Sequence, residues 1–321
     1  MTQLVTDNAT PSTACKHHQL SGGLEIKAQA SLAKLTTFKV GGNAEWLALP
    51  KTPEQLRAAL SWGRSEGLAI TMLGAGSNLL VSDRGLPGLV ICTRALRHSE
   101  FDAVSGRVIA AAGEPWSSLA WKAARNGRKG FEWTIGIPGT VGGAIVMNAG
   151  AHGGETADIL VETEIVSPDG NLSVLSPEDL AYRYRTSNLQ GSDKIVTTAT
   201  FQLSPGHDPA TVKAATAEDL KQRRTTQPYH LPNCGSVFRN PPGNSAGRLI
   251  QEAGLKGHQI GNAQISTLHA NFIVNLGDAK AKEVLALIRH VQAVIQRRNG
   301  ITLETEVKII GDFGYAQPPA E

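Results

Sequence analysis

The chain of 321 residues has 41% hydrophobic and 18% charged residues, a composition that excludes a disordered chain and suits two or three structural units. Its net charge of +3 is mild and its basic residues are scattered, so we expect no nucleic-acid binding, and no apolar run is long enough for membrane insertion. Cys15, Cys92 and Cys234 lie far apart and the N-terminus lacks an export signal, so we expect a cytoplasmic protein without a disulfide framework.

Residues 1–25 are polar and predict a flexible N-terminal tail. Strand-like runs, rich in β-forming residues and bounded by turn residues, dominate the chain from there to about residue 203. These runs are Leu68–Leu73, Gly88–Thr93, Arg107–Gly113, Val161–Pro168 and Ile195–Leu203. Two helices are predicted between them, one capped by Thr52 and ending at Gly67, and one at Trp116–Arg125.

A polar helix and loop replace the strands after Pro205–Pro209, which we interpret as a linker. The clearest later helix has one apolar face, with Asp278 as its expected cap and Gly300 at its end. The face consists of Val284, Leu287, Ile288, Val291, Val294 and Ile295. Residues Ile301–Gly311 then alternate in polarity, which predicts a strand.

Two glycine-rich stretches stand out, Gly74–Asn78 after the first of these strand-like runs and Gly136–Gly154 farther along. Successive backbone amides in such loops can bind an anion, and missing side chains let a flat ligand approach the main chain. Neither stretch matches GxGxxG or the phosphate-binding pattern GxxxxGK[S/T]. The alternative is a pair of tight turns packed on each other, but two such loops favour a cofactor site.

Seven motifs occur in one order between about Leu35 and Gly311: TTFKVGG, GAGSNLL, GIPGTVGGAIVMNAGAHGGE, YRTS, CGSVFRNP, STLHANFIVN and LETEVKIIG. The ordered set resembles the UDP-N-acetylenolpyruvoylglucosamine reductase family, and the block NPPGNSAGRLIQEAGLKG resembles its shorter, type II form. Asn262 and Arg239 stand where the family often has glycine and lysine, which leaves individual contacts to the UDP group unassigned.

The resemblance implies an α+β fold, with a vanillyl-alcohol-oxidase/PCMH-type FAD-binding domain in two subdomains and a smaller α/β substrate-binding domain. We therefore expect the FAD-binding domain at 26–206, with subdomains at about 26–95 and 96–206, and the substrate-binding domain at 207–303. A C-terminal strand and tail, 304–321, would return toward the FAD site.

The resemblance also implies a flavin-dependent oxidoreductase with FAD and NADPH as cofactors. Its implied partner is UDP-N-acetylglucosamine enolpyruvate, reduced to UDP-N-acetylmuramate for peptidoglycan and hence for cell-wall biogenesis, cell shape and cell division. NADPH would use the substrate cleft in turn, and we expect a monomer. The residues expected to bind FAD are Gly74, Ala75, Gly76, Ser77, Asn78, Gly136, Ile137, Pro138, Gly139, Thr140, Gly142, Gly143 and Asn148.

Three residues are implied to be catalytic. The family's YRxS pattern selects Arg185 to stabilise negative charge on the substrate carboxylate, although Arg183 offers the same chemistry. Glu304 and Glu306 share a strand face, so spacing does not separate them, and the family's Glu–Val pair selects Glu306. If buried, Glu306 would favour its protonated form and could donate to the enolate. Ser236 resembles the family's proton donor to carbon, the alternative being a loop serine that caps a turn.

Further positions carry weaker expectations. Arg224, Gln227 and Lys256 are expected to contact the anionic substrate, and His152 to lie near the flavin. Cys234 is interpreted as packing, and the scattered histidines predict no metal site. Two other functions stay open: an FAD oxidase or dehydrogenase of the same fold that tethers its flavin through His or Cys, and a non-catalytic nucleotide- or RNA-binding protein.

Overall fold

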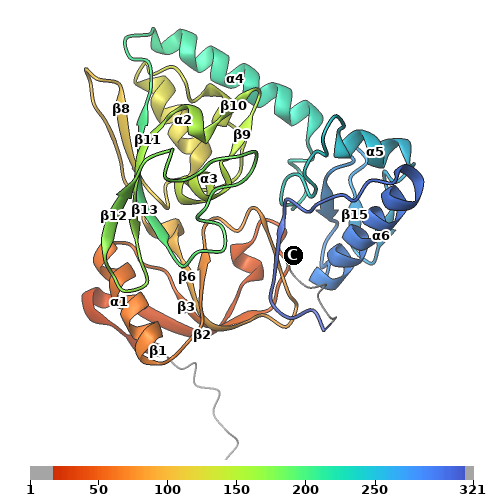
Figure 1. The fold of residues 1–321 in the computed structure, drawn as a ribbon, viewed down its shortest axis with the longest axis horizontal. Helices are drawn as coiled ribbons and strands as arrows, with labels where there is room; N and C mark the ends of the chain where they lie inside the picture. The colour runs from red at the N-terminus through yellow and green to blue at the C-terminus, as the bar shows by residue number, and fades with distance from the viewer. Residues whose placement is uncertain (1–16, 315–321) are drawn as a thin grey trace, which may run out of the picture.

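The computed structural model describes residues 17–314, which form three units (Figure 1). The first two, in red to green, lie side by side, and the third, in blue, lies beyond the end of helix α4 (Figure 1). Most of the expected N-terminal tail and the end of the expected C-terminal tail, residues 1–16 and 315–321, fall outside the described residues. No helix within the described range is both long and apolar enough to cross a bilayer.

The first unit is a five-stranded sheet with helix α1, Pro53–Ser65, against it. The sheet order is β1 (His17–Gln19), β2 (Glu25–Ser31), β3 (Asn43–Ala48), β6 (Leu86–Cys92) and β4 (Ile70–Leu73). Strands β3, β6 and β4 are parallel, and α1 makes the crossover from β3 to β4. As predicted, Thr52 caps this helix, its side chain accepting from the Gln55 amide at 3.3 Å. Residues 17–19, expected in the tail, form the edge strand.

The second unit is an antiparallel sheet covered by helices α2 (Trp116–Arg125) and α3 (Val141–Met147), with α4 (Pro209–Thr226) packed on α2. The strands are, in order, β12 (Leu172–Leu175), β11 (Leu160–Val166), β13 (Ile195–Gln202), β8 (Arg107–Ala111) and β7 (Ser99–Phe101), with a small hairpin of β9 (Gly150–Ala151) and β10 (Gly154–Glu155) alongside. The rings of Trp116, Phe131 and Phe201 pack within 5.2–5.5 Å of one another in its core. Helix α2 has the predicted bounds.

The third unit packs helices α5 (Ala246–Glu252) and α6 (Ala281–Asn299) with a small antiparallel sheet. Its strands are β14 (Gln259–Ile260), β15 (Ala263–Ile265) and β16 (Ile273–Asn275). The predicted apolar face of α6 is buried except for a half-buried Val294. Phe38, Val40 and Leu80 from the first unit belong to the same buried cluster, so the first and third units share a core.

Two local predictions near α6 are wrong. Asp278 does not cap the helix, because Lys280 is the N-cap and Asp278 sits two residues earlier with φ of +55°. The predicted strand over Ile301–Gly311 is reduced to β17, Lys308–Ile310. The preceding residues contain one isolated β-bridge, between Thr305 and Phe238 of the third unit, and Gln292 of α6 donates to the Leu303 carbonyl at 2.9 Å. Gly300 ends the helix as predicted, with φ of +68°.

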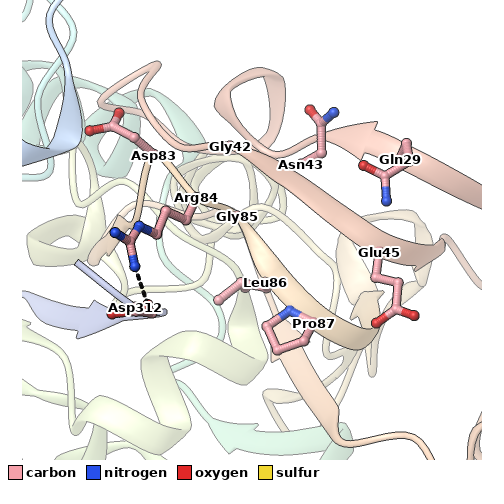
Figure 2. A pocket seen from close by; sticks show the side chains of 10 residues that line it. All are labelled: Gln29, Gly42, Asn43, Glu45, Asp83, Arg84, Gly85, Leu86, Pro87 and Asp312. Carbon is pink, nitrogen blue, oxygen red and sulfur yellow. Dashed lines mark hydrogen bonds and ion pairs between the residues drawn. The ribbon is translucent and has the colours of Figure 1, made fainter. Parts of the chain in front are cut away.

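The first and third units contact each other near strand β5, Leu79–Val81, and β5 pairs in parallel with β17. The Asp83 carboxylate, just after β5, accepts from the backbone amides of Ala281 and Lys282 at 2.8 and 2.9 Å. Arg84 makes an ion pair with Asp312 at 2.5 Å beside a surface hollow of about 660 Å³, and the Asp83 side chain is turned away from that pair (Figure 2). These contacts fix the C-terminal segment against the first unit.

Candidate functional site

A cavity of about 790 Å³ lies where the three units meet. Its walls come from the loop after β4, the loop entering α3, the Tyr184–Arg185 turn, the end of α4, and segments of the third unit. Among the described residues that line it, Glu306 is the one carboxylate, whereas the basic side chains are Arg185, Lys194, Arg223 and Lys308. The balance of charge favours an anionic ligand.

The loop after β4 has its carbonyl groups held by other parts of the first unit. The contacts are Thr93 Oγ1 to Leu73 O at 3.3 Å, Cys92 Sγ to Gly74 O at 3.5 Å, Arg94 Nη2 to Ala75 O at 3.0 Å, and Thr37 N to Gly76 O at 3.0 Å. Arg94 Nη2 also donates to Leu35 O at 2.6 Å. Four consecutive carbonyls are therefore satisfied without any ligand.

The amides of the same loop are not satisfied in this way. Within residues 17–314, the N–H groups of Ala75, Gly76 and Ser77 have no protein acceptor, and all three residues line the cavity. Gly76 has φ of +65°, and a Cβ there would lie 2.2 Å from the Leu35 carbonyl oxygen, so this conformation requires glycine. Consecutive free amides are the arrangement that binds phosphate oxygens.

The second glycine stretch contributes the opposite wall. Most of its predicted binding residues line the cavity: Ile137, Pro138, Gly139, Thr140, Gly142 and Gly143. The amides of Gly139 and Thr140 also lack a protein acceptor within the described residues. Ser77 Oγ donates to the Pro138 carbonyl at 2.8 Å, so the two loops meet directly.

Two predicted cofactor residues of this stretch are not among the lining residues. Asn148 is fully buried, donating to Arg183 O at 3.1 Å and accepting from Ala157 N at 3.0 Å. Gly136 packs against α4 and the residues after it, since a Cβ there would lie 2.9 Å from Arg223 Cδ and 2.6 Å from Tyr229 Oη. Some of the glycines thus allow protein elements to approach one another and do not face the cavity.

Arg185 lies at the cavity in a constrained conformation. Its φ is +54°, unusual for a residue with a side chain, and such conformations concentrate at functional sites. The guanidinium donates to Gly150 O at 2.5 Å and lies 4.8 Å from the centre of the Tyr184 ring. These contacts hold a permanent positive charge at the cavity wall, and its side chain is only 18% exposed.

Glu306 is the carboxylate paired with this arginine, with Oε1 3.4 Å from Arg185 Nε. Burial raises the pKa of Glu306 above its ordinary value, although the charges of Arg185 and Arg239 oppose the shift. Glu304, which the sequence pattern did not distinguish from it, is 74% exposed and pairs with Arg239. Of the two glutamates, only Glu306 lines the cavity.

Ser236 lines the cavity beside the same glutamate, because the Glu306 amide donates to Val237 O at 2.8 Å. Within residues 17–314 the Ser236 hydroxyl has no protein hydrogen-bond partner, so it is available to a ligand. Cys234 is buried, and burial and the charge of Glu306 raise the pKa of its thiol, which keeps it protonated. Arg185, Ser236 and Glu306 therefore converge from three distant segments.

The weaker predictions divide. Gln227 lines the cavity, whereas Arg224 is exposed and, like Lys256, is not among the lining residues. His152 does not line the cavity either, but its Nε2 accepts from Arg223 Nε at 3.2 Å.

Sequence reasoning missed Arg223 and His269, which both line the cavity. Burial lowers the pKa of His269, with Lys256 adding to the effect, and its Nδ1 accepts from the Asn271 amide at 3.2 Å. The quoted STLHANFIVN motif contained His269 but gave no signal of its placement. The described residues hold no group of three or more metal-ligating side chains.

Comparison with known proteins identifies the family. A family profile described as the C-terminal domain of UDP-N-acetylenolpyruvoylglucosamine reductase matches residues 227–310. A protein of that name from Trichormus variabilis is 56% identical over 97% of this chain and 94% of its own length. The chain belongs to the UDP-N-acetylenolpyruvoylglucosamine reductase family. A relative of the same name from Synechocystis is 53% identical over 91% of this chain and 92% of its own length.

Membership in this reductase family makes the chain a flavin-dependent oxidoreductase. The crystal structure of the reductase from Thermus caldophilus has a TM-score of 0.74 and 40% identity, covering 89% of this chain and 98% of that one. A second profile, described as an FAD binding domain, matches residues 44–176, which include both glycine loops. The Thermus structure and this profile confirm the predicted α+β fold with an FAD-binding domain.

The residues present fit FAD. The free amides of Ala75, Gly76, Ser77, Gly139 and Thr140 can take the oxygens of a diphosphate, and a cavity of about 790 Å³ falls in the range of cofactor sites. Consistent with this, the loop carbonyls, which would repel a diphosphate, are satisfied elsewhere in the protein.

Proposed function

We propose that this chain reduces UDP-N-acetylglucosamine enolpyruvate to UDP-N-acetylmuramate, with NADPH as reductant, as a monomer in the cytoplasmic stage of peptidoglycan synthesis. The observation that carries the proposal is the meeting of Arg185, Ser236 and Glu306 at one cavity beside two loops with free amides. When bound and reduced by NADPH, FAD would supply the hydride for the terminal carbon of the enolpyruvyl group. In this division of labour, residues 26–206 hold FAD and 207–303 hold the substrate, and α4, the first helix of the latter range, packs on the second unit.

Arg185 is proposed to stabilise the negative charge that develops on the substrate carboxylate as the double bond is reduced. Its guanidinium stays charged at any working pH, and the Gly150 carbonyl and the Tyr184 ring hold it in place. A positioned charge in a site that excludes water stabilises such an anion far more than it would in water.

Glu306 is proposed to donate a hydrogen bond to the same developing anion. Its raised pKa favours the protonated carboxylic acid, which donates where a carboxylate would repel. The positive charges of Arg185 and Arg239 oppose this rise of the pKa.

Ser236 is proposed to give its proton to the carbon next to the carboxylate. A serine hydroxyl is hardly acidic in water, but the acceptor is a strongly basic carbanion. The hydroxyl lines the cavity without a protein partner that would compete for its proton. Gln227 is proposed to contact the anionic substrate, with Arg224 and Lys256 as further contacts that a rearranged complex would have to bring closer.

The test is NADPH consumption by the purified, FAD-loaded protein with and without UDP-N-acetylglucosamine enolpyruvate, followed by mass analysis of the product. The proposal expects consumption that requires this substrate and a product heavier by two hydrogens. Consumption that is equal without it, or yellow colour retained on the denatured polypeptide, would favour an oxidase with a tethered flavin.

A further inference from the structure

Arg223 is buried at the cavity with most of its hydrogen-bonding capacity unused. The residue is only 8% exposed, and its one side-chain hydrogen bond runs from Nε to His152 Nε2 at 3.2 Å. Its two terminal nitrogens have no protein partner within residues 17–314, and no carboxylate pairs with it there. Neither terminal nitrogen is among the fully buried atoms without a partner, so both open onto the cavity, where a ligand can pair with the charge.

Neighbouring residues fix the position of the Arg223 side chain at the cavity. It lies in the last turn of α4, and Gln227, four residues later, lines the same cavity. The Tyr229 hydroxyl donates to Gly136 O at 2.7 Å, and the absence of a side chain at Gly136 leaves room for the arginine stem. The His152 Nε2 atom accepts from Arg223 Nε, and this contact helps to orient the guanidinium.

The C-terminal dipole of α4 offsets part of this charge but does not explain its burial. Arg224 lies in the same turn, experiences the same dipole and is exposed to solvent. The difference between the two arginines is that Arg223 faces the cavity, where Glu306 is the one lining carboxylate among the described residues and is already paired with Arg185.

We propose that Arg223 and Gln227 form a phosphate-binding subsite at the α4 end of the cavity, separate from the free amides of the glycine loops. A guanidinium with two free nitrogens binds a phosphate through two parallel hydrogen bonds, and an amide side chain beside it adds a donor. His152 is a positioning residue for the arginine. The inference rests on the proposed function, because that function supplies three phosphate-bearing ligands: FAD, UDP-sugar and NADPH.

The experiment compares Arg223→Met with Lys221→Met, which removes one positive charge from an exposed position two residues away on the same helix. Binding of UDP and of NADP⁺ is measured by calorimetry on protein kept in excess FAD, and FAD affinity is measured separately by titrating the apoprotein. Loss of a hydrogen bond to a charged group corresponds to about ten- to hundredfold weaker binding. Circular dichroism and the unfolding temperature of each apoprotein verify that the variants fold.

A loss of that size for UDP in Arg223→Met, but not in Lys221→Met, supports the subsite and assigns it to the UDP-sugar. The same loss confined to NADP⁺ or to FAD supports it and assigns it to the reductant or to the flavin diphosphate. Unchanged binding of all three ligands, or equal losses in the two variants, would overturn it. Binding of UDP does not require turnover, so failure of the subsite and failure of the proposed reaction are distinguishable.

Discussion

Replacing Arg94 by methionine tests whether hydrogen bonds to the carbonyls of the Gly74–Asn78 loop keep its amides oriented toward the ligand. Arg94 Nη2 donates to Leu35 O at 2.6 Å and to Ala75 O at 3.0 Å, so one cationic donor fixes the loop and the segment beneath it. A hydrogen bond to a charged group contributes about 1.5–3 kcal/mol, and leaving the two carbonyls without a donor should lower the free energy of unfolding by about 2–4 kcal/mol.

The same change should weaken FAD binding, because the Ala75 carbonyl is then free to turn toward the ligand and displace the neighbouring amides. Loss of one amide–phosphate contact raises the Kd of FAD by about tenfold or more. Flavin fluorescence titration of the apoprotein measures the Kd, and urea unfolding measures stability. Arg57→Met, at an exposed arginine on α1, controls for the loss of charge. Reduced stability with an FAD Kd within roughly twofold of wild type would refute the positioning role.

The remaining predictions concern Glu306 and the glycines. Because burial raises the pKa of Glu306, the native state binds its proton more tightly than the unfolded chain, so stability falls as pH rises from the unfolded pKa through the native one. The Glu306→Gln variant has no titrating group at this position, so its stability should not fall with pH for this reason. Urea unfolding of both apoproteins between about pH 4 and about pH 8 should show that the free energy of unfolding of the variant, relative to wild type, rises with pH. A relative stability that is constant or falls with pH contradicts the raised pKa. In Gly76→Ala, at φ of +65°, the new Cβ would lie 2.2 Å from Leu35 O, so the free energy of unfolding should fall by well over about 1 kcal/mol and FAD should be released. In the control Gly153→Ala, at φ of +83° with open space around it, the free energy of unfolding should fall by about 1 kcal/mol and FAD should stay bound. Equal flavin retention and equal unfolding of the two variants would count against the loop geometry.

Local sequence patterns predicted the regular elements well and the late segment poorly. Helix α2 and the apolar face of α6 follow from periodicity, since their burial depends on one face against one layer. The alternation at Ile301–Gly311 is real, because Leu303 and Val307 are buried, but only Lys308–Ile310 has a partner strand. Alternation records burial, and pairing depends on distant strand β5.

The site was predictable where a motif fixed it and not where packing fixed it. The alternating pattern did not distinguish Glu304 from Glu306. In the folded structure Glu304 is exposed to solvent, whereas Glu306 lies beside Arg185. Arg223 is buried and the next residue of α4, Arg224, is exposed. Consecutive residues point to different sides of a helix, so the side that is buried depends on how α4 packs on its neighbours. No local pattern reports that docking, which sets which arginine faces the cavity.

The most direct measurement of the central claim is a stopped-flow record of Ser236→Ala that follows flavin absorbance in two separate half-reactions. If Ser236 delivers the proton to carbon, reduction by NADPH proceeds at the wild-type rate, while reoxidation by UDP-N-acetylglucosamine enolpyruvate slows by about 10²–10⁴-fold. Equal slowing of the two half-reactions, or wild-type reoxidation, would contradict the assignment.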